Sequence, residues 1–199
     1  PTPGVMLNAS VFYSRYRNYI EYTNLGVDPD LPQFGLFVYR TDNIGKARIW
    51  GTELSSRFEL GEWLPSAQGL SISFAGGWSN GNATNQVTGE KAALASVLPA
   101  KVVLGVAYDD PGQRFGASLH STLVRGKQAP RNDVLLASET DRFRVPGYAT
   151  LDLNAYWRVN RHATWRLGIY NLTDRKFWDY ASVRDLAPTA MSDIERQAR

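Results

Sequence analysis

The feature that most constrains this chain is a strict alternation of apolar and polar residues, clearest over residues 149–159. Every second residue there is Ala, Leu, Trp or Val, and the residues between them are Thr150, Asp152, Asn154, Tyr156 and Arg158. Successive side chains of an extended strand point to opposite faces, so a period of two predicts a β-strand with one apolar and one polar face.

Six further stretches carry the same alternation, and the first of them is the least regular. They lie near residues 7–13, 50–60, 70–78, 101–108, 114–123 and 164–170. The sequence therefore predicts about seven strands of about ten residues, which is longer than the ~5–6 residues usual in globular proteins. A tilted strand needs ~9–11 residues to cross the core of a bilayer, so this length suits a transmembrane strand.

The connections between these strands alternate in length. The short ones lie near residues 61–68, 109–112 and 160–163, and the long polar ones lie near 23–35, 80–99, 126–146 and after Asp174. Outer-membrane barrels have short periplasmic turns and long outer loops, whereas a sandwich has no reason to place every long loop at one end. We therefore predict an all-β fold, an antiparallel up-and-down transmembrane β-barrel.

Composition agrees with this fold class without deciding it. Hydrophobic residues make up 43% of the chain, the mean hydropathy is −0.33, and no stretch approaches the ~18 apolar residues of a spanning helix. Aromatic residues reach 12%, which fits strands that are apolar on one face only. The alternative is a soluble antiparallel sheet with one buried face, such as a β-sandwich binding module.

Two sets of residues favour the barrel over the sandwich. Charged residues recur on the polar face, where they would line a wet lumen, namely Arg57, Glu59, Arg114, Asp152 and Arg158. Tryptophans fall near the predicted strand ends, where the aromatic girdles of a barrel lie, namely Trp50, Trp63, Trp78, Trp157 and Trp165.

Charge and motifs exclude several functions. The net charge of +3 comes from scattered arginines and not from a basic stripe, so we expect no nucleic-acid partner. The absence of cysteine excludes disulfides and thiolate metal sites. Asp28 and Asp30 alone are too few for a calcium site, and we expect no metal. The chain has no Gly-x-Ser-x-Gly, no His-Glu-x-x-His and no phosphate-binding glycine loop, so we expect that it is not an enzyme.

Both ends of the chain look like cuts in a longer protein. It begins at Pro1-Thr2-Pro3-Gly4, without a start Met or a signal peptide, and closes on an unpatterned polar run over residues 192–199. Seven strands leave one descending strand missing, because complete barrels of this kind have even strand numbers. We expect residues 1–199 to be the C-terminal part of one barrel domain.

Three segments resemble TonB-dependent receptors. Residues 43–54 resemble the element in which an Asn-x-Gly-x-Ala segment leads into Gly-x-Glu. Residues 98–108 resemble the family's Pro-x-Lys entry into the next strand. Residues 170–180, with Asn-Leu-Thr-Asp followed by Trp-Asp-Tyr, resemble the Asn-Leu-x-Asp element near the C-terminus, and this extended version is most similar to haem and haemoglobin receptors.

The resemblance implies the C-terminal portion of a large plugged barrel in the outer membrane of a Gram-negative bacterium, in contact with lipid and lipopolysaccharide. It implies TonB-dependent active import of haem, taken from haem itself or from haemoproteins. The TonB complex would act through a plug domain that is not present in this chain. No intrinsic cofactor is expected, because haem or a ferric chelate is the transported ligand. The alternatives are a ferric-siderophore or cobalamin receptor, a passive porin and an outer-membrane enzyme.

Candidates for ligand contact lie in the predicted outer loops. Tyrosines near the loop bases are candidates for stacking on or ligating a porphyrin, namely Tyr19, Tyr22, Tyr39 and Tyr180. Loop arginines are candidates for pairing with haem propionates or siderophore anions, namely Arg125, Arg131, Arg142, Arg144 and Arg184. From these we select Tyr22, Tyr39, Arg131, Arg142 and Tyr180. The alternatives are aromatic-girdle or loop packing for the tyrosines, and solvent or lipopolysaccharide phosphates for the arginines.

Other polar residues have simpler explanations. His120 is predicted to point into the lumen as a hydrogen-bonding group, and His162 lies in a short turn. The long loops contain no histidine, so histidine ligands of a haem are expected outside this chain. Structural roles are predicted for the motif residues: a bend or close backbone approach at Gly45 and Gly51, a lumenal charge network of Glu53, Ser55 and Arg57, and capping of backbone amides by Asn171 and Asp174.

Overall fold

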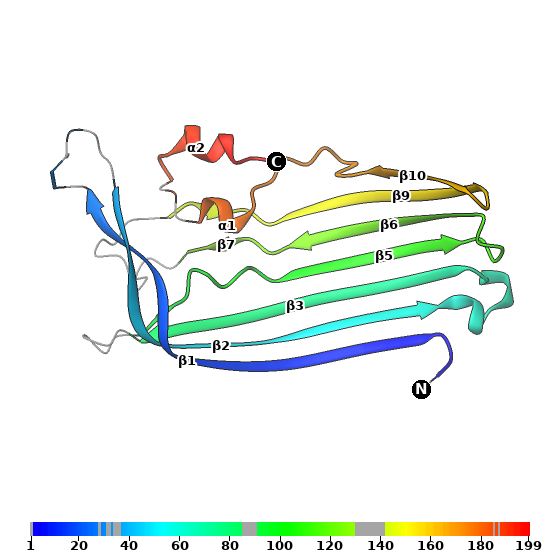
Figure 1. Ribbon diagram of the computed structural model, residues 1–199, viewed down its shortest axis with the longest axis horizontal. Coiled ribbons are helices and arrows are strands. Elements are labelled where there is room, and N and C mark those ends of the chain that lie inside the picture. Colours follow the sequence, from blue (N-terminus) through cyan, green and yellow to red (C-terminus); the bar gives the residue numbers. More distant parts are fainter. Residues whose placement is uncertain are drawn as a thin grey trace.

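The computed structural model describes residues 2–27, 29–30, 33, 37–84, 91–129, 142–184, 186 and 188–199. These residues form one curved antiparallel sheet with short helices near one end (Figure 1). Its strands, in spatial order, are β1 (Val5–Val27), β2 (Phe37–Glu59), β3 (Leu70–Thr84), β5 (Lys101–Asp109), β6 (Phe115–Val124), β9 (Tyr148–Asn160) and β10 (Ala163–Ile169). Spatial order equals sequence order, so the predicted up-and-down arrangement of seven strands is confirmed.

Smaller elements lie at the two ends of the sheet. The turn end carries the short 3-10 helices η2 (Leu60–Glu62) and η3 (Pro65–Ala67). The loop end carries β4 (Lys91–Ala93), which pairs with β3, and the two-stranded ribbon of β7 (Lys127–Gln128) and β8 (Arg144–Val145). It also carries α1 (Tyr180–Val183) and α2 (Met191–Arg196). The all-β antiparallel barrel architecture is confirmed, and β1 and β10 are the two open edges of the barrel wall in this chain.

Three strands extend further toward the loop end than the alternation predicts. β1 continues to Val27, β2 begins at Phe37 and β3 continues to Thr84, so the loops expected from residues 23 and 80 begin inside strands. Beyond the apolar band the outward residues of β3 are polar, and the alternation that reveals a strand in the sequence disappears. For the same reason Trp50 and Trp78 lie within long strands and not at strand ends, and this detail of the sequence prediction is wrong.

The strand register places the predicted apolar residues of all seven strands on one face of the sheet. For example, Ile72 pairs with Val106, Val106 with Leu119, and Leu119 with Leu153. Many of these side chains are exposed, with 86% of Val11 and 72% of Trp165 accessible. A continuous apolar surface across seven strands has no stable place in water, whereas it matches the lipid-facing surface of a barrel.

Aromatic residues mark both borders of this apolar face. Near the turn end, Tyr108 lies 6.1 Å from Phe115 between ring centroids, and Trp157 is the register partner of Trp165. Toward the loop end, Tyr13 is the register partner of Trp50. From Ala149 to Trp157 the face rises by about 26 Å along the strand at ~3.3 Å per residue. A tilt of ~35–45° reduces this rise to about 20 Å, close to the ~25 Å apolar band of outer-membrane barrels.

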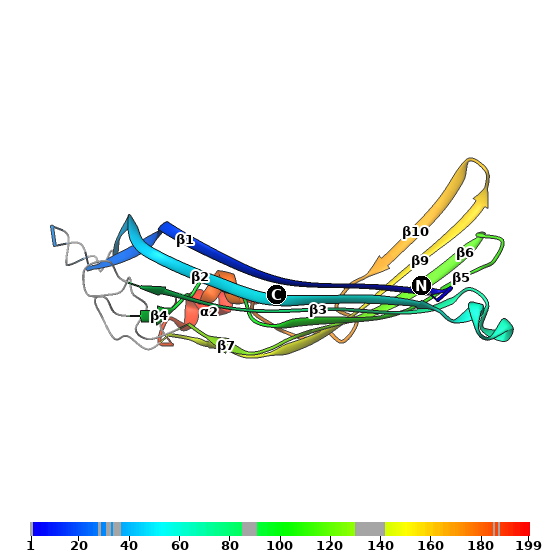
Figure 2. The ribbon, with the colours of Figure 1, turned by 90° about the horizontal axis from the view of Figure 1, so that it is seen from below.

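The buried hydrophobic clusters of the described residues lie near the loop end, and there are two of them. One contains Ala47, Ala83, Leu94 and Val97, and the other contains Val145, Tyr180 and Val183. Within the described ranges no second sheet covers either face, so the β-sandwich alternative is wrong. α2 lies inside the curve of the sheet (Figure 2). No helix in the described part of the chain is long and apolar enough to cross a membrane.

Candidate functional site

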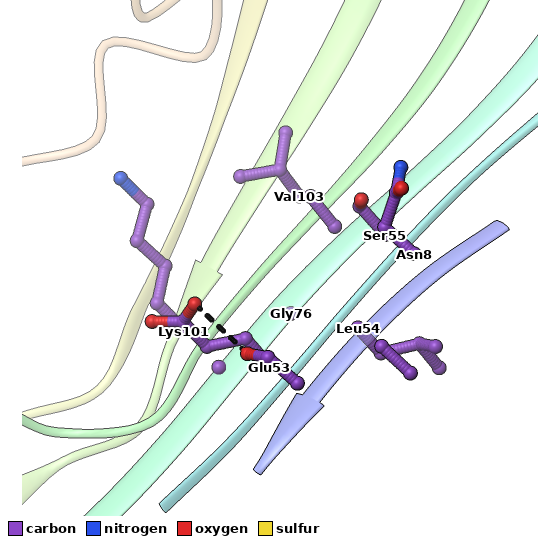
Figure 3. Close-up of a pocket in the computed structure, with 11 residues that line it drawn as sticks. Asn8, Glu53, Leu54, Ser55, Gly76, Lys101 and Val103 are labelled. Carbon is purple, nitrogen blue, oxygen red and sulfur yellow. Dashed lines mark hydrogen bonds between the residues drawn. The ribbon is translucent and has the colours of Figure 1, made fainter. Parts of the chain in front are cut away.

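The polar face of the sheet forms a concave wall with a hollow across β1, β2, β3 and β5 (Figure 3). The hollow exists because β3 contributes only Ala75, Gly76 and Gly77 at its centre, and a Cβ added at Gly77 would meet no atom closer than 3.7 Å. Glu53 and Lys101 lie at its edge. This part of the wall therefore presents one acidic and one basic group beside a small-residue floor.

The predicted charge network of Glu53, Ser55 and Arg57 is divided into separate pairs. Glu53 accepts a 3.4 Å hydrogen bond from the hydroxyl of Ser10 on β1. Arg57 forms an ion pair with Glu59, with Nε 2.5 Å from Oε1. The charges thus lie on the predicted face, but Glu53 is bonded to a neighbouring strand and not to Arg57.

A second hollow of about 450 Å³ lies nearer the turn end, between β2, β3, β5, β6, β9 and β10. Its lining includes His120, Arg57 and Arg166, so the predicted lumenal position of His120 is confirmed. A Cβ at Gly105 would lie 2.8 Å from the His120 ring, so the ring lies directly over this glycine. Opposite, the Tyr156 hydroxyl donates a 3.0 Å hydrogen bond to Asp109. The hollow therefore holds two guanidinium groups, of which that of Arg57 is paired with Glu59, together with the His120 ring and the Asp109 carboxylate.

The glycines of the segment 43–54 have the predicted close approaches. Gly45 has a φ of 98°, a value that favours glycine, and pairs with Tyr19 at an irregularity in the β1–β2 register. At Gly51 an added Cβ would lie 2.5 Å from the Trp78 carbonyl oxygen and 2.7 Å from Phe12 Cζ. These glycines let β1 and β2 bend and let an aromatic ring lie flat on the wall.

The Asn-Leu-Thr-Asp segment forms a tight turn just after β10. Asn171 has a φ of 51°, its Oδ1 accepts from the Arg175 amide at 3.0 Å, and its Nδ2 donates to the Arg175 carbonyl at 3.0 Å. Asp152 of β9 accepts from the Asn171 amide at 2.8 Å. The capping role predicted for Asn171 is confirmed. Asp174 joins the turn through its own amide, which donates to the Asn171 carbonyl at 2.8 Å.

The connections at the loop end pack on one another and form a cap on the concave side. The carbonyl oxygen of Ala95 accepts hydrogen bonds of 3.0 Å from both the Tyr180 hydroxyl and Arg184 Nη1. Lys127 donates to the Val97 carbonyl and lies 5.0 Å from the centre of the Tyr180 ring. Burial, and then the charge of Arg184, lower the pKa of Lys127. We call the segments 94–97, 127–129, 142–145, 176–184 and 188–199, together with Leu186, the loop cap.

The C-terminal residues of the cap fold as a unit that the sequence pattern missed. Trp178 Nε1 donates a 2.8 Å hydrogen bond to the Ile194 carbonyl, and Phe177 and Arg199 exchange backbone hydrogen bonds. The Phe177 ring stacks on Tyr148 at 4.2 Å between centroids. The polar run from residue 192 was predicted to be unpatterned, but α2 covers most of it and buries Ile194. A lone apolar residue in a short helix leaves too little periodicity to detect.

The selected candidates differ in their positions. Tyr22 and Tyr39 lie on β1 and β2, two register pairs apart at the loop end, and their side chains lie outside the described part of the chain. Arg131 also lies outside the described residues. Arg142 and Tyr180 are in the loop cap, with only 5% and 2% of their surfaces accessible. A ligand would reach these last two only after the cap had opened.

In the described ranges no group of three or more His, Cys, Asp or Glu side chains could hold a metal ion.

His162 lies in the turn between β9 and β10, where its ring nitrogen lies 2.7 Å from Arg161 Nε. The chemistry available on the concave side is thus hydrogen bonding and charge pairing.

A family model described as "TonB dependent receptor-like, beta-barrel" matches residues 2–172. Curated relatives match nearly the whole chain at low identity. A probable hemoglobin and hemoglobin-haptoglobin-binding protein 4 of Haemophilus influenzae is 28% identical over 96% of this chain. A hemoglobin-haptoglobin utilization protein B of Neisseria meningitidis serogroup C is 24% identical over 89% of the chain. The chain spans about a fifth to a quarter of the length of these relatives, 20% and 24% respectively.

Solved structures share the fold. A copper transporter, OprC, aligns with a TM-score of 0.69 at 18% identity, covering 90% of this chain and 25% of that one. The ferric citrate transporter FecA aligns with a TM-score of 0.62 at 15% identity, covering 88% and 25%. The FrpB iron transporter of Neisseria meningitidis aligns with a TM-score of 0.62 at 13% identity, covering 90% and 26%. At these identities the likeness is one of fold alone.

Proposed function

We propose, since this chain belongs to the TonB-dependent receptor-like β-barrel family, that it is part of an outer-membrane receptor that imports haem. The source of the haem would be free haem or a haemoprotein, and the organism a Gram-negative bacterium. Because the chain spans about a fifth of its curated relatives, the activity belongs to the whole protein, and the chain supplies part of its barrel wall and its outer loops.

The observation that carries this proposal is the extent of the match to haemoglobin-binding relatives. Two of those from Haemophilus influenzae are 28% identical over 96% of the chain, a share that includes loop segments as well as strands. The transporters among the solved structures are named for copper, ferric citrate and iron, and their likeness does not select a cargo. The relatives' names therefore favour haem over a siderophore.

The charge of the concave wall is compatible with such a cargo. Arg57, Arg166 and His120 line the hollow near the turn end, and Lys101 lies beside the hollow in Figure 3. A haem carries two propionates, and guanidinium groups bind carboxylates through paired hydrogen bonds. We propose that these groups form part of the polar path along which an anionic cargo moves.

The loop end is the proposed capture surface. Tyr22 and Tyr39 lie on the long β1–β2 hairpin, and Arg131 lies in the connection between β7 and β8. We propose these three for direct contact with the cargo or its carrier protein. Arg142 and Tyr180 would contribute after a rearrangement of the loop cap. Energy would come from the TonB complex through a plug domain, as the family membership implies.

Three measurements on the full-length receptor test the proposal. Titration with haemin should shift the Soret band, and a receptor-deletion strain should regain growth on haemoglobin as iron source only when the receptor gene is restored. A protonophore should stop uptake, whereas a passive porin would be unaffected. Binding of a ferric siderophore without any Soret shift would contradict the haem assignment and favour the siderophore alternative.

A further inference from the structure

Three basic residues form a cluster on the apolar face, just beyond its aromatic border at the loop end. Arg15 and Arg48 are direct register partners across β1 and β2, and Lys46 follows on the same face two residues from Arg48. All three side chains are exposed, whereas Ala47, which lies between Lys46 and Arg48, is buried on the concave side. The three cations therefore point outward from the barrel and not into its lumen.

No acidic side chain among the described residues forms an ion pair with this cluster. None of the ion pairs found among the described residues involves Arg15, Lys46 or Arg48. Like charges directly opposite each other on paired strands are destabilising. The strand register nevertheless holds Arg15 and Arg48 face to face. Such an arrangement becomes favourable when an anion lies between the two guanidinium groups.

A groove on the same face leads to the cluster. Its lining includes Val11, Tyr13, Trp50, Trp78 and Arg48. Its floor is apolar and aromatic, and one end is marked by a guanidinium group and by Asn82. Aromatic rings of this kind lie at the headgroup level of a membrane, with acyl chains on one side and polar groups on the other. The groove thus joins a surface for an acyl chain to a surface for an anionic headgroup.

We propose that Arg15, Lys46 and Arg48 bind the phosphorylated headgroup of a lipopolysaccharide molecule in the outer leaflet, with one of its acyl chains in the groove beside Tyr13 and Trp78. The proposal rests on the membrane placement given under the proposed function, with the long loops outside. Charge complementarity supports a phosphate, because the cluster is wholly basic in the described part of this face. The adjoining apolar groove supports a lipid and not a free anion.

Lipid retention by the full-length receptor tests this site. The receptor, purified in a mild detergent, is mixed with diphosphorylated lipid A and examined by native mass spectrometry. The triple variant Arg15→Gln, Lys46→Gln and Arg48→Gln should bind at least about tenfold more weakly, since each surface cation contributes about 1 kcal/mol toward an anionic lipid. The matched control is Arg114→Gln, Arg158→Gln and Arg161→Gln, which removes three exposed cations from the turn end and should retain the lipid.

Each other outcome would overturn the proposal. Equal loss of lipid A binding in both triple variants would mean that only the net charge of the receptor matters. Unchanged binding in the Arg15, Lys46 and Arg48 variant would show that these residues do not bind the lipid. Dephosphorylated lipid A that binds equally well would assign binding to acyl chains alone, and displacement by millimolar inorganic phosphate would assign it to free anions. Folding of both variants is checked by heat-dependent gel mobility. Haemin titration is run in parallel, so failure of the lipid site and failure of haem binding are separate results.

Discussion

The hydroxyl of Tyr180 donates a hydrogen bond of 3.0 Å to the carbonyl oxygen of Ala95, a residue that lies 85 positions earlier in the chain. Arg184, the residue that follows α1, donates to the same oxygen. Two outer connections that are far apart in sequence are therefore joined at one backbone atom. The described segments at the loop end of this wall consequently form a packed surface.

Tyr180→Phe should make the loop cap less stable while leaving the aromatic ring buried in it. The ring remains packed against Val145 and Val183, and only the hydroxyl bond is lost, which costs about 1 kcal/mol. Amide hydrogen exchange of residues 178–184 should accelerate about fivefold. Tyr170→Phe is the control, because Tyr170 is 72% exposed. Unchanged exchange in the Tyr180 variant would show that the hydrogen bond does not hold the cap.

Arg184→Gln should raise the pKa of Lys127. Burial and the charge of Arg184 both lower this pKa, so removing the second cation relieves part of the shift while burial keeps the rest. The neutral amine, which is the form that reacts with acetylating reagents, then appears at higher pH. The pH midpoint of Lys127 acetylation should move upward in the variant relative to the unmodified receptor. A downward movement would contradict the assigned charge coupling.

Gly51→Ala should destabilise the barrel by about 1–3 kcal/mol, because the added methyl group overlaps backbone and cannot be accommodated by a rotamer change. The overlapping atom is the Trp78 carbonyl oxygen, at 2.5 Å. Gly77→Ala on the same face is the matched control, since its Cβ meets only Glu53 Cγ at 3.7 Å. Urea unfolding in lipid vesicles compares the two, and equal stabilities would refute the close approach.

Asn171→Ala should cost more than Asn171→Gly. Both variants lose the two side-chain bonds to Arg175. Only alanine must also hold a φ of 51°, which costs roughly 1–2 kcal/mol more. Asp174→Gly, at a φ of 47°, should be nearly neutral. Hydrogen exchange over residues 171–176 measures the order, and the reverse order would show that the turn is not held in this conformation.

The transmembrane part of the fold could be predicted because its pattern is local. Leu151 and Asp152 differ in polarity since one faces lipid and the other faces the lumen, and the same contrast recurs on every strand. The outer extensions of β1 and β3 could not be predicted from the alternation. In β3 the outward residues Asn82 and Thr84 are polar, and the inward residue between them is the small, buried Ala83. The apolar outward residues that reveal the other parts of the strands are therefore missing there.

The loop cap could not be predicted for a different reason. Tyr180 contacts Ala95, and Trp178 contacts Ile194. Each contact joins residues that are far apart in the sequence, and such a contact leaves no repeating pattern of apolar and polar residues. The sequence shows three aromatic residues within residues 177–180. Such a density of aromatic residues is typical of a packed segment as well as of a binding surface, so it is also consistent with the packing observed for Tyr180.

The claim on which all else depends is that one face of each strand meets lipid and the other meets a polar lumen. It is tested most directly by single cysteines introduced at Leu153, Asn154, Ala155 and Tyr156 of the reconstituted full-length receptor. Residues 1–199 contain no cysteine, and any cysteine elsewhere in the receptor is first replaced by serine. Nitroxide labels at positions 153 and 155 should be relaxed by lipid-dissolved oxygen and protected from a water-soluble nickel chelate. Labels at 154 and 156 should show no such preference for oxygen. Equal oxygen accessibility at all four positions, or the opposite alternation, would contradict the account.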